Sequence, residues 1–416
     1  MPIRKATPDG SLTRRALLGG VASLAAISAS SAVSAQSRDT SAEWNDSFDA
    51  GSRARAARNS FPVLGAHTVQ GLEQAIGEYQ GIVSRGGWPM VPGGDRLRIG
   101  SRRPAVVALR DRLIASGDLD AAAGRSDVFD SFFDTAVKRL QTRHGISPDG
   151  VLRESSYAAL NVPAEVRLRQ LEINLVRVRA YSGFLGQRYI VMNIPAAQLE
   201  AVDNGSVVSR HVTVVGKIDR QSPIISTRVV DINFNPFWTV PTSIIRKDLI
   251  PKMQTEPDYL TKNRIRIFSA RGEEVQPQAI NWQSMDALNY RFRQDPFDGN
   301  SMGNVRINIP NPHSVYMHDT PSKGLFGEES RFHSSGCARI QNVRELVAWI
   351  LQGTQWSRSE IDRIFKTNDR VDARPVAPVP VYWVYVTGWA NPDGLIQFRE
   401  DIYQRDGLPV SQQAQL

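Results

Sequence analysis

The sequence is poorest in cysteine, because its 416 residues contain only Cys337. A disulfide within the chain is therefore excluded, and a lone cysteine is either a buried structural residue or one kept for its reactivity. Small residues precede Cys337 and a charged residue, Arg339, follows it. This setting argues against a core position, so we interpret Cys337 as a reactive thiol.

Long apolar runs and dense basic clusters are also missing. Beyond residue 35 nothing approaches the stretch of about 20 apolar residues that a membrane helix needs. The formal net charge is +8, yet no basic cluster is interleaved with aromatic residues, which argues against nucleic acid as a partner. A mildly basic chain suits an anionic polymer or a membrane surface.

No cofactor is expected from the sequence. The nearest approach to a metal site would combine His313, His318 and Cys337. Structural zinc sites use four ligands at closer spacing, and no fourth ligand is evident here. We therefore predict neither a metal nor an organic cofactor.

The first 35 residues have the composition of an export signal. Arg14 and Arg15 form a twin-arginine start, residues 16–32 are apolar with many small side chains, and residues 33–35 offer a cleavage site. We predict a signal peptide over residues 1–35, a periplasmic location by the twin-arginine route, and no stable membrane span after cleavage. An uncleaved N-terminal anchor is the alternative.

Two short segments carry the residues suited to catalysis. Residues 315–321 read Val-Tyr-Met-His-Asp-Thr-Pro, and residues 333–339 read His-Ser-Ser-Gly-Cys-Ala-Arg. A thiolate can attack a carbonyl while an imidazole takes the thiol proton and later returns it to the leaving amine. Cys337 is thus the candidate nucleophile and His318 the candidate base, with His333 as the alternative base.

The remaining site candidates surround this pair. Ser335 and Gly336 are small, so a substrate carbonyl could approach backbone N–H groups able to hold an oxyanion. Arg339 presents a planar fork of donors, which either orients a substrate carboxylate or braces the loop. Tyr316 alternates with His318 and would share its strand face, whereas Asp319 would point to the other face as a structural residue.

These segments resemble the signature of the L,D-transpeptidases (the YkuD domain), cysteine enzymes that cross-link peptidoglycan. The family pattern is a histidine, a gap of one to two dozen residues, and then Ser-His-Gly-Cys-x-Arg or Asn. Ser335 stands where most members have histidine. The Tyr-x-His-Asp-Thr-Pro run is similar to the YcbB-like branch, which tolerates serine at that position.

The resemblance implies a reaction on peptidoglycan tetrapeptide stems. Cys337 would attack the third residue, release the terminal D-alanine and form a thioester, which an amine of a neighbouring stem would convert into a 3→3 cross-link. It also implies acylation of Cys337 by carbapenem-type inhibitors. An L,D-carboxypeptidase or endopeptidase, a transferase attaching a lipoprotein to the wall, and an inactive wall-binding protein are the alternatives.

The rest of the pattern predicts an α+β multidomain protein with a β-rich catalytic domain of the YkuD type. Helical spacing at Val106, Leu109 and Leu113 and at Phe133, Val137 and Leu140 begins a small three-helix unit. That unit resembles the peptidoglycan-binding domain of wall enzymes, a helical spacer without ligand being the alternative. The predicted segments are a flexible or helical N-terminal region at 36–94, the peptidoglycan-binding-like unit at 95–162, a scaffold helix at 163–184, the catalytic domain at 185–386 and a C-terminal extension at 387–416.

Local signals within the catalytic domain are of several kinds. Asp203-Asn204-Gly205 predicts a hairpin turn, and Asn342 followed by Glu345 predicts a helix start with a capping box. Residues 244–302 are polar, mixed and too long for a simple loop. By resemblance they form a capping lid over the groove, the alternative being an excursion with no gating role. Trp238, in a proline-bounded corner before this segment, lies beside the active site in the family or else is a core residue.

Overall fold

The computed structural model describes residues 60–181, 183, 185–367 and 369–407. The predicted signal peptide lies outside these residues, so the structure does not bear on it. Within the described ranges, no helix is both long enough and apolar enough to cross a membrane.

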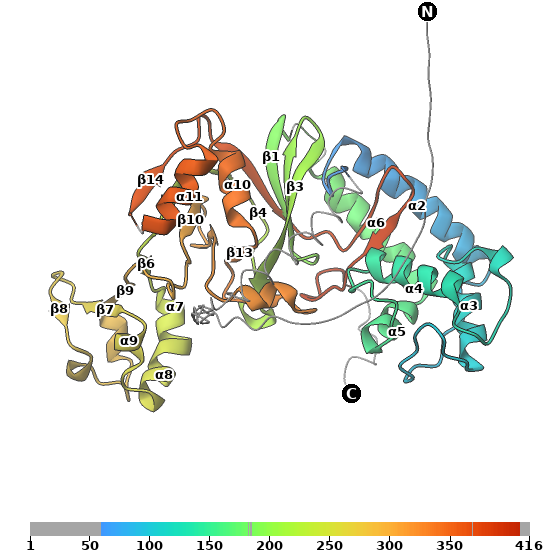
Figure 1. The fold of residues 1–416 in the computed structure, drawn as a ribbon, viewed down its shortest axis with the longest axis horizontal. Coiled ribbons are helices and arrows are strands. Elements are labelled where there is room, and N and C mark those ends of the chain that lie inside the picture. The colour runs from blue at the N-terminus through green and yellow to red at the C-terminus, as the bar shows by residue number, and fades with distance from the viewer. Residues whose placement is uncertain (1–59, 182, 184, 368, 408–416) are drawn as a thin grey trace, which may run out of the picture. The chain divides into compact units, whose positions relative to one another are not determined.

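A large mixed sheet forms the centre of the catalytic region (Figure 1). Its strands are β1 Arg188–Asn193, β2 Gln198–Asp203, β3 Ser206–Gly216, β4 Ile225–Val229, β5 Asp231–Phe234, β10 Val305–Asn308, β11 Met317–His318, β12 Phe332–Ser334, β13 Ala338–Ile340, β14 Val371–Ala373 and β15 Val379–Val384. They pair in the order β14-β5-β10-β11-β13-β3-β2-β1-β15-β4, and β12 pairs with β3. The β2–β3 turn has positive φ at Asn204 (49°) and Gly205 (76°), as a two-residue hairpin of type I′ requires.

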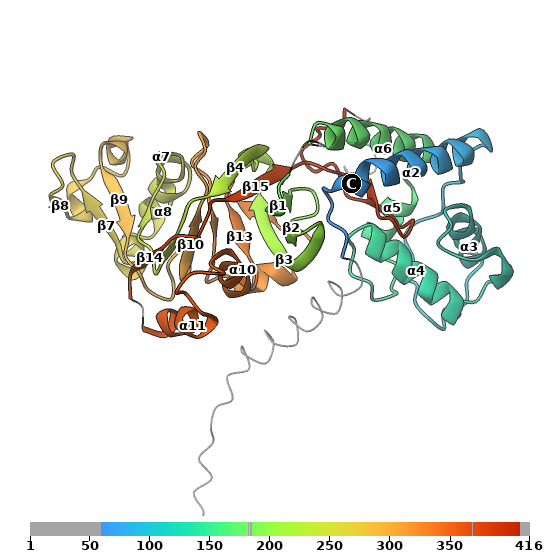
Figure 2. The same cartoon turned by 90° about the horizontal axis from the view of Figure 1, so that it is seen from above.

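One half of this sheet is covered on both faces. Along β1, Ile190 and Met192 face a core that includes α10 (Val343–Ile350) and α11 (Arg358–Thr367). Tyr189 and Val191 face a second core that includes α2 (Ala66–Ser84) and α6 (Ala164–Arg179). Figure 2 shows α10 and α11 on the same side of the sheet.

The other half, from β5 to β13, is covered on one face only. Buried residues such as Ile232, Ile307 and Ala338 face the α10–α11 core. They alternate with partly exposed polar residues such as Asn233 and Arg306, because successive side chains of a strand point to opposite faces. We call this second surface the polar face, and it carries the candidate site.

The N-terminal part is helical. The helices α3 (Ala105–Ala115), α4 (Ser131–Arg143) and α5 (Glu154–Leu160) enclose a separate core that includes Leu109, Phe133 and Leu140. Helix α2 packs along α6. The short strands β16 (Gly388–Ala390) and β17 (Ile396–Phe398) of the C-terminal extension pair with each other and join the same core as α2 and α6.

The segment between β5 and β10 is a folded unit with its own core rather than a polar loop. It contains β6 Trp238–Thr239, α7 Thr242–Ile244, a π-helical turn Ile245–Leu249, α8 Ile250–Thr255, α9 Tyr259–Lys262, β7 Ile265–Phe268, β8 Glu274–Val275 and β9 Arg291–Gln294. The strands pair in the order β6-β9-β7-β8 around buried residues such as Leu260, Ile267 and Phe292. We call this unit the lid, drawn in yellow in Figure 1.

One local prediction needs correction. Helix α10 begins at Val343, as expected, but Asn342 has a left-handed backbone (φ 52°, ψ 38°) and its side chain makes no capping hydrogen bond. The N–H of Glu345 bonds instead to the backbone oxygen of Asn342. A tight turn after β13 therefore starts this helix, without the predicted capping box.

Candidate active site

The sheet register brings the two sequence segments together. Strands β11 and β13 are parallel neighbours, with Met317 opposite Ala338 and His318 opposite Arg339. The N–H of Ala338 donates to the oxygen of Tyr316 over 2.9 Å, which places Cys337 beside Tyr316 at the start of β13. Met317 and Ala338 are buried in the core. Because successive side chains of a strand point to opposite faces, their sequence neighbours Tyr316, His318, Cys337 and Arg339 are directed to the polar face.

The Cys337 thiol is half-buried at this edge of the core. The backbone N–H of Tyr316 lies 3.4 Å from its sulfur and donates to it. Burial raises the pKa of Cys337, while the Tyr316 hydrogen bond and the positive charge of Arg339 act in the opposite direction. The thiol is therefore protonated near neutral pH and needs a base to become a nucleophile.

A backbone hydrogen bond fixes the tautomer of His318. Its Nδ1 lies 2.5 Å from the backbone oxygen of Asp319, and a carbonyl can only accept a hydrogen bond. The neutral ring therefore carries its proton on Nδ1 and leaves Nε2 as the basic nitrogen. Burial first, and then the charge of Arg339, lower the pKa of His318 to about 4. The imidazole is neutral at pH 7 and can take a proton.

Arg339 lies across from His318 with its guanidinium largely uncommitted. Its Nε is buried without a hydrogen-bond partner, and it forms no ion pair with any residue that the structure describes. Burial lowers its pKa, and the nearby Cys337 sulfur opposes this. Arg339 therefore lacks the contacts it would need to brace the loop. This favours a role in which it binds the substrate or stabilises the thiolate.

The loop before Cys337 is fixed by hydrogen bonds that the sequence did not reveal. Ser334 Oγ accepts from the N–H of Gly336 over 3.1 Å and donates to the oxygen of Cys337 over 2.6 Å. Ser222 Oγ donates to the oxygen of Gly336 over 2.8 Å. Gly336 has φ 115°, a backbone conformation that favours glycine.

These contacts change which backbone group can hold an oxyanion. The N–H of Gly336, one of the backbone groups that the sequence offered for this role, is already engaged by Ser334. The N–H of Cys337 has no acceptor in the described part of the chain. It is therefore the better candidate for that role.

Ser335 is exposed and connects the loop to the lid. Its Oγ accepts from Nη1 of Arg220 over 3.0 Å, and Nη2 of Arg220 donates to Oδ1 of Asp248 over 2.9 Å. Asp248 belongs to the π-helical turn of the lid. Arg220 thus joins the lid to the loop that carries Cys337, and nothing in its local sequence signals this.

The other predicted residues separate into two groups. Tyr316 lies at the site, with the Arg306 guanidinium carbon 5.0 Å from the centre of its ring. Asp319 is buried away from it, where it accepts from the N–H of Asn304 over 3.1 Å and pairs with Lys323. Trp238 pairs within the lid sheet and packs on the lid core, in line with its interpretation as a core residue.

The alternative base, His333, is engaged elsewhere. Its side chain is exposed on β12, and its Nε2 lies 2.7 Å from a carboxylate oxygen of Glu328 and 2.9 Å from the oxygen of Ser330. His313 is also exposed, in a turn. Of the histidines weighed for the role of base, His318 is the one placed on the strand beside Cys337.

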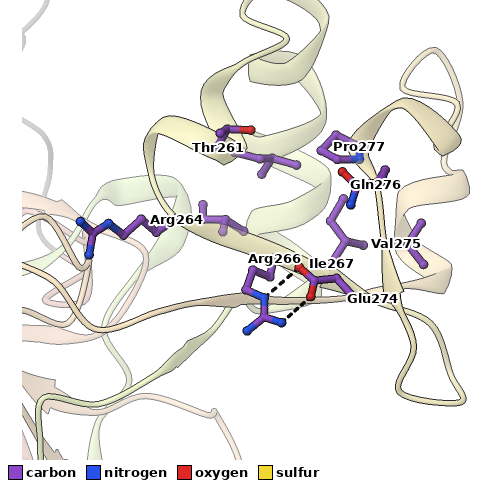
Figure 3. Close-up of a pocket in the computed structure, with 10 residues that line it drawn as sticks. Thr261, Arg264, Arg266, Ile267, Glu274, Val275, Gln276 and Pro277 are labelled. Atoms are coloured by element: carbon purple, nitrogen blue, oxygen red, sulfur yellow. Dashed lines mark hydrogen bonds and ion pairs between the residues drawn. The ribbon is translucent and has the colours of Figure 1, made fainter.

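A pocket of about 220 Å³ lies within the lid, and none of the candidate catalytic residues lines it. Figure 3 shows its wall at β7 and β8, where Arg266 Nε donates to Oε1 of Glu274 over 2.8 Å. Elsewhere in the described residues, no group of three or more His, Cys, Asp or Glu side chains is arranged to hold a metal ion.

Two parts of the chain match known protein families. Residues 187–365 match the YkuD family, the L,D-transpeptidase catalytic domain, and residues 102–160 match a peptidoglycan-binding domain. A protein of Haemophilus influenzae named as an L,D-transpeptidase is 30% identical over 239 residues, which is 57% of this chain and 48% of that protein. The N-acetylmuramoyl-L-alanine amidase CwlM of Mycobacterium tuberculosis is 39% identical over 75 residues, 16% of this chain and 18% of that protein. The chain thus spans half or less of the length of these curated relatives.

Solved structures give a weaker likeness. An L,D-transpeptidase of Enterococcus faecium is 11% identical, with 48% of this chain and 50% of that chain covered and a TM-score of 0.23. One from Xylanimonas cellulosilytica is 13% identical, with 70% and 99% covered and a TM-score of 0.23. These structures are only remotely similar to this chain. The domain is identified by the match of residues 187–365 to the YkuD family.

Proposed function

From the YkuD L,D-transpeptidase catalytic domain that residues 187–365 contain, we propose that this protein forms 3→3 cross-links between peptidoglycan stem peptides. The observation that carries the proposal is the parallel pairing of β11 and β13. It places an imidazole whose Nε2 is the basic nitrogen on the strand beside the only cysteine of the chain.

In the first step the donor stem acylates the enzyme. The Cys337 sulfur attacks the carbonyl carbon of the third residue while Nε2 of His318 accepts the thiol proton. The carbon–nitrogen bond to the terminal D-alanine then breaks, and the amine leaves with the proton that His318 returns. The products are a thioester on Cys337 and free D-alanine.

Two fixed groups stabilise the negative charge that develops in this step. The N–H of Cys337 is free to donate to the oxyanion, and such a donor stabilises a tetrahedral intermediate without reorganising. The guanidinium of Arg339 lowers the pKa of the thiol, so its positive charge also favours the sulfur as it becomes anionic. Both groups act in the transition state, where they raise the rate.

In the second step an amine of a neighbouring stem attacks the thioester. His318 Nε2 accepts a proton from the attacking amine, the carbon–sulfur bond breaks, and the thiolate regains a proton as the new peptide bond forms. Water would give hydrolysis instead of a cross-link. The lid, tied to the Cys337 loop through Arg220, limits access of water to the thioester.

The remaining features concern location. We propose that residues 1–35 direct the chain to the periplasm and that residues 102–160 hold it on the wall, where the stems are present. The match of these latter residues to a peptidoglycan-binding domain supports that second role. We also propose that carbapenem-type inhibitors acylate Cys337.

The test uses purified protein with disaccharide-tetrapeptides and mass spectrometry of the products. The wild-type protein should release D-alanine and form tetrapeptide–tripeptide dimers. Cys337→Ala should lose both activities and still bind isolated cell-wall sacculi. D-alanine release that persists in the variant refutes the mechanism, and release without dimers would identify a carboxypeptidase.

A further inference from the structure

The polar face extends beyond the catalytic pair onto the next strand. On β10, Arg306 lies opposite His318 of β11 and opposite Asn233 of β5. Its neighbours Val305 and Ile307 are fully buried in the core. Alternation therefore directs the Arg306 side chain to the same face as His318.

Arg306 is held in place by neutral groups. Its Nε and Nη2 both donate to Oδ1 of Asn233, over 3.0 and 2.7 Å. Its guanidinium carbon lies 5.0 Å from the centre of the Tyr316 ring. One side of the guanidinium fork is thus fixed, and Nη1 is left with no acceptor in the described ranges.

Two carboxylates on the neighbouring strands β5 and β14 are bonded to other groups. Asp231 accepts from the side-chain amides of Asn308 and Asn233. Asp372, on the edge strand β14, accepts from Asn233 over 2.7 Å. Neither forms an ion pair with Arg306 in the part of the chain that the structure describes.

Among the residues that the structure describes, neither Arg306 nor Arg339 has a carboxylate partner, so the site contains two guanidinium groups without a counter-ion from those residues. Arg306 and Arg339 lie on the strands that flank His318, and the positive charges of both lower its pKa. A half-buried guanidinium fork with free donors matches a carboxylate, with which it forms charge-assisted hydrogen bonds. A ligand that carries carboxylates would supply the missing negative charge.

We propose that Arg306 binds a side-chain carboxylate of the donor peptide, and so selects a third residue that ends in such a group, as diaminopimelate does and lysine does not. This inference rests on the proposed function. Strands β13 and β10 are separated by one strand, so their backbones lie about 10 Å apart. A carboxylate at the end of a long side chain reaches towards Arg306, whereas the leaving D-alanine must stay at the thiol, nearer Arg339.

The experiment measures D-alanine release from soluble tetrapeptides that differ only at the third residue. That residue is diaminopimelate, diaminopimelate with its side-chain carboxylate amidated, or lysine. For wild-type protein, kcat/KM should be about 10- to 100-fold higher for the free carboxylate, the range expected for a charge-assisted pair. Arg306→Gln should abolish this preference, mainly through KM, so that kcat/KM for the free carboxylate falls to that for the amide measured with the same variant.

Two further variants complete the test. Arg306→Lys keeps the charge but loses the fork, so it should retain a reduced preference. Arg344→Gln is the matched control, because Arg344 also lies over an aromatic ring, 4.4 Å from Phe365, but on helix α10. It should behave as wild type. The proposal is overturned if Arg306→Gln lowers kcat/KM equally for all three peptides, or does not lower it for any of them. If Arg306→Gln does not fold, an unreduced preference in Arg306→Lys overturns it.

A second readout is independent of turnover. Iodoacetate and iodoacetamide alkylate the same thiol, but only iodoacetate is an anion. The rate with iodoacetate divided by the rate with iodoacetamide therefore reports the affinity of the site for an anion. The ratio should fall several-fold in Arg306→Gln and stay constant in Arg344→Gln. If wild-type protein released no D-alanine from any peptide, the proposed function would fail, while this ratio would still decide whether Arg306 attracts a carboxylate.

Discussion

The catalytic pair is predicted to rest as a neutral thiol and a neutral imidazole, not as an ion pair. The pKa of His318 is about 4, and burial raises the pKa of Cys337 above its ordinary value, which is about 8.5 for a free thiol. Transfer of the thiol proton to the imidazole is therefore unfavourable at rest, because burial disfavours the charged form of both groups.

Alkylation of Cys337 by iodoacetamide tests this directly, because it is the only cysteine and the intact mass reports on it alone. At pH 7 at most about 3% of the thiol should be thiolate. The rate should rise about tenfold per pH unit through neutrality and reach half of its maximum above pH ~8.5. Cys337→Ser should not react. Arg339→Gln should shift the midpoint to higher pH, because this guanidinium lowers the thiol pKa.

A different profile would refute the reasoning. In an ion pair the thiolate already exists when the imidazole is protonated, so the rate would be flat from about pH 5 to 7 and high at neutrality. A plateau of that kind in wild-type protein, lost in His318→Gln, would mean that the site rests as an ion pair. The mechanism would then begin from thiolate rather than from general-base deprotonation.

Three further predictions follow from the same geometry. His318→Gln should lower D-alanine release about 10²- to 10⁴-fold. The same variant should also lose less stability in acid than wild-type protein does. The folded pKa of His318, about 4, lies below its ordinary value of 6.5. Wild-type protein therefore loses up to about 3 kcal/mol of its free energy of unfolding as pH falls from 6.5 to 4. Urea unfolding at pH 4.5 and 7.5 measures this, and equal losses in both proteins would contradict it. Asp248→Asn breaks the link from the lid to Arg220 and should raise the ratio of free tripeptide to dimer several-fold. Asp219→Asn, which removes the exposed carboxylate 3.7 Å from Arg220, should not do so; equal ratios in both would remove the proposed role of the lid. Gly336→Ala forces alanine into φ 115° with its Cβ 3.4 Å from Val315, and should cost about 1–2 kcal/mol in chemical unfolding. Gly324→Ala, with open space around it, is the neutral control.

The lid shows where local patterns stopped being informative. The residues of 244–302 alone indicated only a polar, mixed segment, and the resemblance was needed to predict a lid there. In the structure the unit begins at β6 and forms its own sheet and core. Its strands are two to four residues long and separated by turns. Segments this short contain too few alternations for a period to be recognised.

By itself, the sequence determined the features that depend on near neighbours. The helical periods of α3 and α4, the Asn204–Gly205 turn and the segments around His318 and Cys337 are all encoded within a few residues. The chemistry of a lone cysteine and a nearby histidine could likewise be inferred from residue type and order.

The tertiary structure decided which side of the sheet is open and which distant residues meet there. Arg306 reaches the site through strand register. Arg220 and Ser222 reach it through a loop, and Ser222 lies more than a hundred residues from Cys337 in the sequence. A strand pattern shows which residues share a face of that strand. It does not show which strand will lie beside it, because that choice depends on how the whole core packs.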